Sequence, residues 1–182
     1  MEIRDLKSKE IECKIATINS KGLSLLLYKT ARTDMQILDE TFGQMNWQCE
    51  YKEVKGNLYC TILVYNSETK EWISKQDCGV ESAFGDKEKG EASDAFKRAG
   101  FKWGIGIELY TSPFIWINSE NCNLKETNKK DAYGNPIYTC RDKFIVEKIE
   151  IIDKEITGLS IINTNLNNKR VFVYIKPKKE VE

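Results

Sequence analysis

The chain has 182 residues, enough for one domain with a small appended subdomain, and 41% of them are hydrophobic, enough for a buried core. Its 28 lysine and arginine residues balance its 28 aspartate and glutamate residues. Whole-molecule charge therefore excludes a general attraction to nucleic acid or anionic membrane, and any such site must come from local segregation of charge.

The absence of histidine excludes Ser-His and Cys-His hydrolases and mixed Cys/His zinc sites, so an enzyme would need carboxylates, lysine or a metal. The six cysteines show no C-x-x-C spacing and are expected to be reduced, structural thiols. The apolar stretch from Leu23 to Tyr28, interrupted only by Ser24, is too short to span a bilayer, and the start shows no signal-peptide pattern. We expect a cytoplasmic protein without cofactor or metal.

The first strand and helix are expected in the opening quarter of the chain. Residues 1–30 begin with charges and then alternate in "IECKIA", which predicts a short strand. The segment "TARTDMQILDETFG" predicts a helix over residues 31–42, capped by Thr30 or Thr33 and ended by Gly43. Its apolar face is expected to contain Met35, Leu38 and Phe42.

Three strand signals follow in close succession: "WQCEYKEV", "LYCTILVY" and "WISKQDCG". The turns between them, "KGN" and "NSETKE", are short, which predicts an antiparallel three-stranded sheet. Because side chains alternate between the two faces of a strand, one face of the first two strands is expected to contain the following residues: Trp47, Cys49, Tyr51, Leu58, Cys60, Ile62 and Val64.

After the loop "GVESAFGD", a second helix is expected to begin near Lys87 and to contain "GEASDAFKRAGFKWGIG", whose last glycines mark its end. One stripe is expected to pack on the sheet: Ala92, Ala95, Phe96, Ala99 and Trp103. The opposite side carries Asp94, Lys97, Arg98 and Phe101, with Lys102 at its edge. Because an aromatic there has no place in the same core, Phe101 is expected to meet a ligand or another subunit.

Pro113 ends this part of the chain, and the polar stretch "NSENCNLKETNKKDAYGNP" after it is expected to be a mobile loop. Further strands are expected in "IYTCRDKFIVEKIEII", "EITGLSIIN" and "KRVFVYI", and the final "KPKKEVE" is expected to be frayed. The expected fold is α+β: an antiparallel β-β-β-α core preceded by a helix (31–113), with an N-terminal segment (1–30) and a C-terminal β-rich extension of the same domain (114–182).

Two enzyme-like patterns are weak. Gly85 and Gly90 have the separation of a P-loop, but Glu91 stands where the phosphate-binding lysine is required. A nuclease magnesium site could be drawn from acidic residues whose spacing matches no metal loop, and which suit loops and helix starts instead: Asp77, Glu81, Asp86, Glu88 and Glu91.

The basic residues of the second helix are open to two interpretations. Lys97, Arg98 and Lys102, with Lys87 and Lys89 before them, could bind a phosphate backbone while Phe101 or Tyr110 stacks on bases. Alternatively, they form a solvated face with partners at i to i+4, such as Asp94 with Arg98. The pattern alone leaves both open.

The order of these motifs resembles the Rad-fifty-two superfamily of single-strand annealing proteins, with phage Sak-type recombinases and the bacterial DdrA-like branch most similar. The resemblance covers about residues 28–113. It is carried by "FG..NW" (residues 42–47) and "EKGEASDAFKRA..KWGIG", and residues 114–182 match only loosely.

The resemblance implies a homo-oligomer, as a ring or open helix, in which sheets continue between subunits. Members bind single-stranded DNA in a basic groove and anneal complementary strands without ATP in phage or bacterial recombination and repair, acting in the bacterial host cytoplasm where phage-encoded. They are not enzymes in the bond-making sense. Carried over by position, the DNA-binding residues are Arg32, Lys89, Lys97, Arg98 and Lys102, while Phe101 either stacks on a base or contacts the next subunit.

Further partners that the resemblance implies are a single-strand-binding protein or an exonuclease. Three alternatives stay open from the residues. One is a double-stranded RNA or DNA binding module without annealing activity, because an antiparallel sheet with a basic helix also suits duplex recognition. The others are a metal-dependent nuclease using the carboxylates above and a structural phage protein that ignores DNA.

Overall fold

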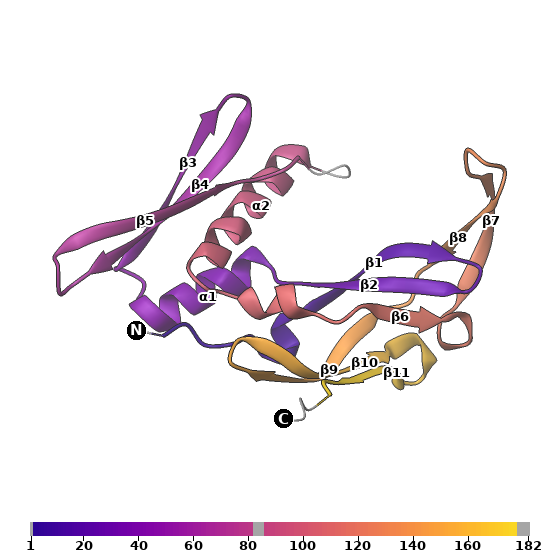
Figure 1. Cartoon of the computed structure of the whole chain (residues 1–182). Helices are drawn as coiled ribbons and strands as arrows, with labels where there is room; N and C mark the ends of the chain where they lie inside the picture. Colours follow the sequence, from indigo (N-terminus) through magenta and orange to yellow (C-terminus); the bar gives the residue numbers. More distant parts are fainter. Residues whose placement is uncertain (1, 82–85, 178–182) are drawn as a thin grey trace. The chain divides into compact units, whose positions relative to one another are not determined.

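The computed structural model describes residues 2–81 and 86–177, and these form an α+β fold with two α-helices and antiparallel strand pairs (Figure 1). The α+β expectation is therefore confirmed. The chain divides into two compact units: unit 1 contains residues 1–6 and 29–107, and unit 2 contains residues 7–28 and 108–182. The expected N-terminal segment, 1–30, is thus shared between the two units.

Helix α1 (Ala31–Phe42) in unit 1 has the predicted bounds. The Thr30 hydroxyl accepts a hydrogen bond from the Thr33 amide at 3.3 Å, and Gly43 ends the helix with φ of 83°. The predicted apolar face was partly wrong, because Met35 is exposed. The buried residues of α1 are instead Thr33, Asp34, Ile37 and Leu38.

Strands β3 (Trp47–Val54), β4 (Asn57–Asn66) and β5 (Glu71–Cys78) form the predicted antiparallel meander in the order β3-β4-β5. The cross-strand partners of Trp47, Cys49 and Tyr51 are Val64, Ile62 and Cys60, which confirms that these side chains share one face. Within the described residues, β3 and β5 each pair only with β4, so both outer edges of this sheet are open.

Helix α2 (Lys87–Lys102) packs on β4 and β5. Asp86 caps it by accepting a hydrogen bond from the Lys89 amide at 3.3 Å. The predicted stripe is confirmed in Ala95, Phe96 and Ala99, which are fully buried, while Ala92 and Trp103 are half-buried. The loop expected before α2 lies partly outside the described residues, at 82–85, and so does Gly85 of the P-loop comparison.

Unit 2 is built on a six-stranded sheet in the order β11-β10-β9-β1-β2-β6. Its end strands, β6 and β11, also contact each other, so the sheet nearly closes on itself. Its core is aliphatic and includes Leu23, Leu25, Ile117, Val146 and Ile161. The strands are β1 (Glu12–Asn19), β2 (Gly22–Tyr28), β6 (Ile115–Asn118), β9 (Phe144–Ile152), β10 (Glu155–Asn163) and β11 (Lys169–Ile175).

The polar stretch expected to be a mobile loop contains a strand, which corrects that expectation. Strand β7 (Leu124–Lys130) pairs with β8 (Pro136–Cys140) in a two-stranded hairpin. The segment expected as one long strand is therefore two strands, β8 and β9, separated by residues 141–143. The remaining short elements are 3-10 helices at Ser8–Glu10, Ile107–Thr111, Ser119–Asn121 and Thr164–Leu166.

The start of the expected frayed tail is held by bonds to β10. The Lys176 ammonium pairs with Glu155, and the Lys176 amide donates to the carbonyl of Thr157 at 2.8 Å. The rest of that tail, residues 178–182, lies outside the described residues. Of the two α-helices described, neither has the length and apolar character needed to cross a membrane.

Candidate nucleic-acid interface

The solvent-facing side of α2 carries the basic residues that the sequence singled out. We define the α2 surface as Asp94, Lys97, Arg98, Phe101 and Lys102. Arg98 and Lys102 are exposed, with about half of each side chain accessible, and Lys97 and Phe101 are half-buried. At about 100° per residue, Lys97 and Arg98 flank the line through Asp94 and Phe101.

The cations of the α2 surface already have acidic partners. Asp94 receives Arg98 Nε at 2.9 Å and Lys97 Nζ at 3.8 Å, and it also accepts the Val80 amide at 3.2 Å. The Asp94–Arg98 ion pair expected under the alternative interpretation is therefore present. A phosphate that binds here has to compete with this carboxylate.

Lys102 is held against β5 at the edge of the surface. Its ammonium lies 3.4 Å from the Asp77 carboxylate and donates to the carbonyl of Gln76 at 2.7 Å. Lys75 of β5 donates in turn to the carbonyl of Lys102 at 2.9 Å, and its ammonium lies 4.6 Å from the centroid of the Trp103 ring. These contacts fix the end of α2 to the sheet.

Two of the predicted DNA-binding residues lie elsewhere on unit 1. Arg32 is exposed in the first turn of α1. Lys89 is exposed in the first turn of α2, nine residues before Arg98, a spacing that turns the helix by about 180°. Of the predicted basic residues, Lys97, Arg98 and Lys102 therefore lie on the α2 surface and Lys89 does not. Lys87 lies two turns before Asp94, on the same side of the helix.

A buried ion pair supports the α2 surface, and sequence reasoning missed it. Lys29, with 1% of its side chain exposed, donates to the carboxylate of Asp34, which is fully buried. The same ammonium donates to the carbonyl of Lys97 at 3.2 Å and lies 4.1 Å from the centroid of the Phe101 ring. Phe101 therefore has a partner within its own chain, which the two expected roles did not include.

Two glycines make room for this ion pair. A Cβ on Gly100 would come within 2.4 Å of Asp34 Oδ2, and one on Gly106 within 2.7 Å of Lys29 Cδ. Gly106 and Gly104 also adopt positive φ of 72° and 93°, in agreement with their predicted place at the helix end. Substitution at either Gly100 or Gly106 would displace the ion pair.

The Asp34 carboxylate is not fully satisfied. Its Oδ1 atom is buried and has no hydrogen-bond partner among the described residues. Burial raises the pKa of Asp34 to about 6, although the neighbouring Lys29 and Lys97 act to lower it. The buried Asp34 carboxylate depends on Lys29 to stay ionised, so we treat the two residues as one ion pair.

Four of the five carboxylates considered for a metal site have other partners, and one of these four, Asp86, caps α2. Glu91, which excluded the P-loop, accepts the backbone amide of Leu58 at 3.1 Å and so fastens the start of β4 to α2. Asp77 pairs with Lys102, and Glu81 lies 3.8 Å from Lys87. Within residues 2–81 and 86–177, no group of three or more Cys, Asp or Glu side chains is arranged to hold a metal ion.

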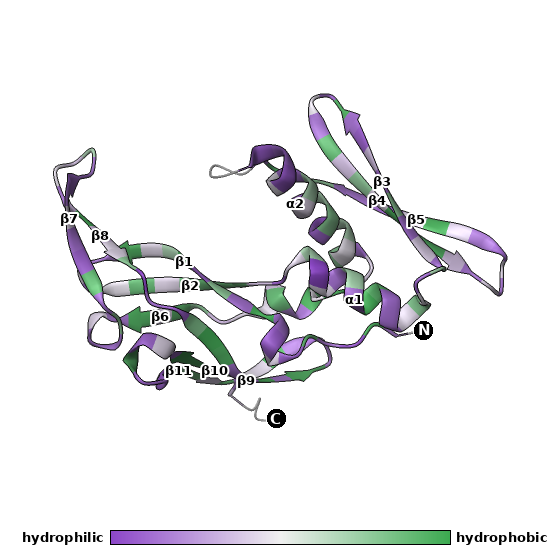
Figure 2. Cartoon of the chain, turned by 180° about the vertical axis from the view of Figure 1, so that it is seen from behind, coloured by the Kyte–Doolittle hydropathy of each residue, from purple (hydrophilic) through white to green (hydrophobic). Residues whose placement is uncertain are grey.

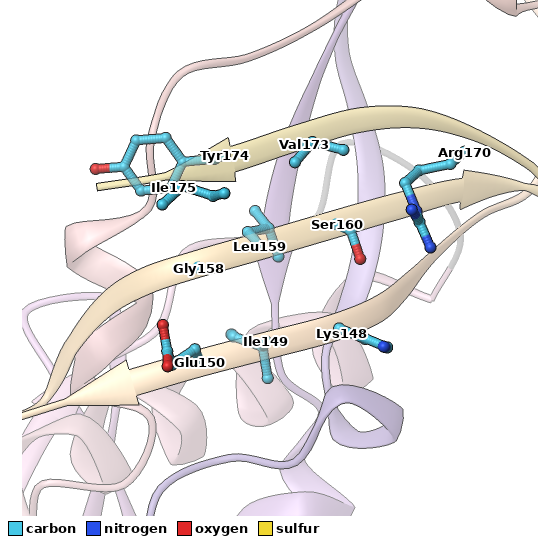
Figure 3. A pocket seen from close by; sticks show the side chains of 10 residues that line it. All are labelled: Lys148, Ile149, Glu150, Gly158, Leu159, Ser160, Arg170, Val173, Tyr174 and Ile175. Atoms are coloured by element: carbon cyan, nitrogen blue, oxygen red, sulfur yellow. The ribbon is translucent and has the colours of Figure 1, made fainter. Parts of the chain in front are cut away.

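A shallow hollow lies over β9, β10 and β11 in unit 2 (Figure 3). Gly158 has no side chain to fill the hollow, and it lies between Glu150 of β9 and Ile175 of β11, whose apolar side chain is exposed. Its rim arginine is engaged, because Arg170 binds Glu147 through two hydrogen bonds of 2.6 and 2.7 Å. These bonds lower the pKa of Glu147 to about 2, so the pair stays charged and matched at neutral pH.

No family model matches the chain, and neither a curated protein nor a solved structure matches it significantly.

Proposed function

We propose that the chain is a single-strand annealing protein of the Rad-fifty-two type, which binds single-stranded DNA through the α2 surface and anneals complementary strands without ATP. The observation that carries this proposal is the outward presentation of Lys97 and Arg98 on a helix packed over a three-stranded meander. This is the arrangement that the resemblance implies for a DNA groove.

The pairing of these cations with Asp94 bears on affinity. Because phosphates must compete with a carboxylate, we expect moderate affinity that falls steeply as salt rises. Backbone contacts carry no base information, so little sequence preference is expected.

The open edges of the β3-β4-β5 sheet support the oligomeric part of the proposal. Among the described residues each outer strand pairs with a strand on one side only, so a strand of a second copy can pair with the other side. We propose a homo-oligomer, either a ring or a helical filament, that acts in the cytoplasm during phage or bacterial recombination and repair.

The test is annealing of complementary oligonucleotides without nucleotide, with particle mass measured in the same sample by light scattering. Lys97→Ala/Arg98→Ala is expected to weaken binding of single-stranded DNA about tenfold or more at moderate salt and to slow annealing, with an unchanged circular dichroism spectrum. A matched control is Lys52→Ala/Lys55→Ala, which removes two exposed charges from the β3 to β4 turn region.

Wild-type-like annealing by the Lys97/Arg98 variant would remove the α2 surface as the binding site. Competition with duplex DNA and RNA separates the proposal from the duplex-binding alternative, since an annealing protein must release its paired product more readily than the single strand.

A further inference from the structure

The hairpin of β7 and β8 presents a second concentration of basic residues in unit 2. We call residues 124–140 the arm. In Figure 1 it extends away from the six-stranded sheet of the same unit, and in Figure 2 β7 is coloured mainly as hydrophilic. Neither strand of the arm contains a buried residue. Its exposed cations are Lys125, Lys129 and Lys130.

The arm joins unit 2 through contacts of β8 with β1 and through hydrogen bonds at its base. There the Asn123 amide and side chain both donate to Asp142, at 2.7 and 2.9 Å, and Asp142 also accepts from Asn163 at 2.7 Å. An isolated two-stranded hairpin is marginally stable at best in water, and neither strand of this one contains a buried residue. Its exposed side chains are therefore not explained by a contribution to the core.

The arm's cations differ from those of the α2 surface because, within residues 2–81 and 86–177, they form no ion pair with an acidic side chain. Among the described ion pairs, none involves Lys125, Lys129 or Lys130. The two acidic side chains of the arm are engaged otherwise: Glu126 accepts from the Tyr138 hydroxyl at 3.3 Å, and Asp131 binds groups of its own turn. A phosphate reaching these lysines displaces counterions rather than a protein carboxylate.

The turn at the tip holds an aromatic side chain in solvent. The Asp131 carboxylate accepts the amides of Tyr133 and Asn135 at 2.9 and 2.8 Å and the Asn135 side chain at 3.2 Å. Gly134 adopts φ of 84° and donates to the Asp131 carbonyl at 3.1 Å. The result is a defined turn in which Tyr133 is 91% exposed.

Local and unit-wide charge agree with a polyanionic ligand. Residues 123–143 contain five basic and three acidic residues. Unit 2 contains 16 basic and 13 acidic residues, whereas unit 1 contains 12 basic and 15 acidic residues, so the neutral chain is positive in unit 2 and negative in unit 1. Unit 2 therefore has a net positive charge, which favours the approach of a polyanion.

We propose that the arm is a binding site for single-stranded nucleic acid, in which Lys125, Lys129 and Lys130 contact backbone phosphates and Tyr133 stacks on an unpaired base. A single strand fits better than a duplex because its bases are free to stack on an exposed ring. This site shares no residue with the α2 surface, so the proposal for the arm can be tested independently of the proposed function.

The experiment uses the full chain and a fluorescein-labelled oligothymidine, with binding measured over a range of salt concentrations. Lys125→Gln/Lys129→Gln/Lys130→Gln is expected to weaken binding about tenfold and to make the slope of log K against log salt about 2 units shallower, because three phosphate contacts are lost. Tyr133→Ala is expected to weaken binding roughly tenfold, and Tyr133→Phe, which keeps the ring, to retain it.

The matched control is Lys52→Gln/Lys55→Gln/Lys70→Gln, which removes three exposed lysines from unit 1. If the control and the arm variant weaken binding equally, net charge alone explains the effect and the proposal is overturned. Equal loss in the Tyr133→Ala and Tyr133→Phe variants would remove the stacking role.

Photo-crosslinking to a bromodeoxyuridine oligonucleotide, followed by peptide mapping, locates the contact directly. Crosslinks within residues 124–140 support the proposal, and crosslinks confined to α2 overturn it while leaving the proposed function intact. A parallel measurement uses vesicles of anionic lipid: an arm variant that loses vesicle binding but keeps oligothymidine binding overturns the proposal in favour of a membrane surface.

Discussion

The α2 surface and the arm both concentrate lysine and arginine, yet the two regions hold their charges in opposite ways. On α2, Asp94 and Asp77 take up Lys97, Arg98 and Lys102 as ion pairs. On the arm, the lysines have no such partner among the described residues. A count of basic residues along a helix or hairpin therefore does not measure how available those residues are to a phosphate.

The regions also differ in what lies beneath them. The α2 surface rests on the buried Lys29–Asp34 pair, to which Phe101 and the Lys97 carbonyl are joined. Strands β7 and β8 of the arm contain no buried residue, although β8 contacts β1. Substitutions in the buried Lys29–Asp34 pair should thus change stability and binding together, while those in the arm should change binding alone.

The largest expected effect is on the buried pair. Lys29→Met leaves Asp34 buried without its cation and is expected to lower the free energy of unfolding by about 3–5 kcal/mol. The measurement is chemical denaturation followed by tryptophan fluorescence, with exposed Lys52→Met as the control, for which little change is expected.

A double variant sharpens this result. Lys29→Met/Asp34→Leu replaces the pair by apolar side chains of similar shape and is expected to recover much of the lost stability. If Lys29→Met alone is as stable as the natural chain, the buried pair does not support the α2 surface.

A smaller effect is expected from removing the competitor on α2. Asp94→Asn keeps an acceptor for the Val80 amide but frees Lys97 and Arg98 from a carboxylate. Affinity for single-stranded DNA is expected to rise about three- to tenfold at low salt, with a steeper salt dependence, as measured by fluorescence anisotropy. Unchanged affinity would mean that the α2 surface does not contact the strand.

The smallest effect is expected on the stability of the arm variants. Because no residue of β7 or β8 is buried, the arm triple variant and Tyr133→Ala should each change the free energy of unfolding by less than about 0.5 kcal/mol in thermal or chemical melts. A loss well above this would show that the arm packs against the rest of the chain, and the contrast with α2 would disappear.

Elements with a clear period were predictable from the sequence. Helix α1 has the predicted bounds, α2 begins at Lys87, and β3, β4, β5, β10 and β11 coincide with predicted strands. The missed strands lack the alternation that prediction uses. Strand β2 ends in four consecutive apolar residues, Leu25 to Tyr28, and β6 has only four residues. Strand β7 is polar on both faces, so nothing in its pattern separates it from a loop.

Only the solvent-facing residues of the candidate site were predictable from the sequence. Helical spacing gave the outward position of Lys97 and Arg98 and the Asp94 partner. Lys29 contacts a helix residue that lies 68 positions later in the sequence, Lys97. In the sequence alone, Lys29 cannot be told from an exposed lysine that precedes a helix cap. Gly100, in the last turn of α2, was an available signal, because a glycine within a helix often marks a close approach.

The strand order of unit 2 has a consequence for synthesis of the chain. Strands β1 and β2 leave the ribosome early and can form their hairpin at once, but the β9 neighbour of β1, joined through the Glu12 and Ile145 pair, follows about 130 residues later. At about 5–20 residues per second, this hairpin waits roughly 6–30 seconds for β9 while unit 1 emerges between them. Unit 1 can therefore fold first, and the exposed edge of β1 is the part of the nascent chain most in need of protection from misassembly.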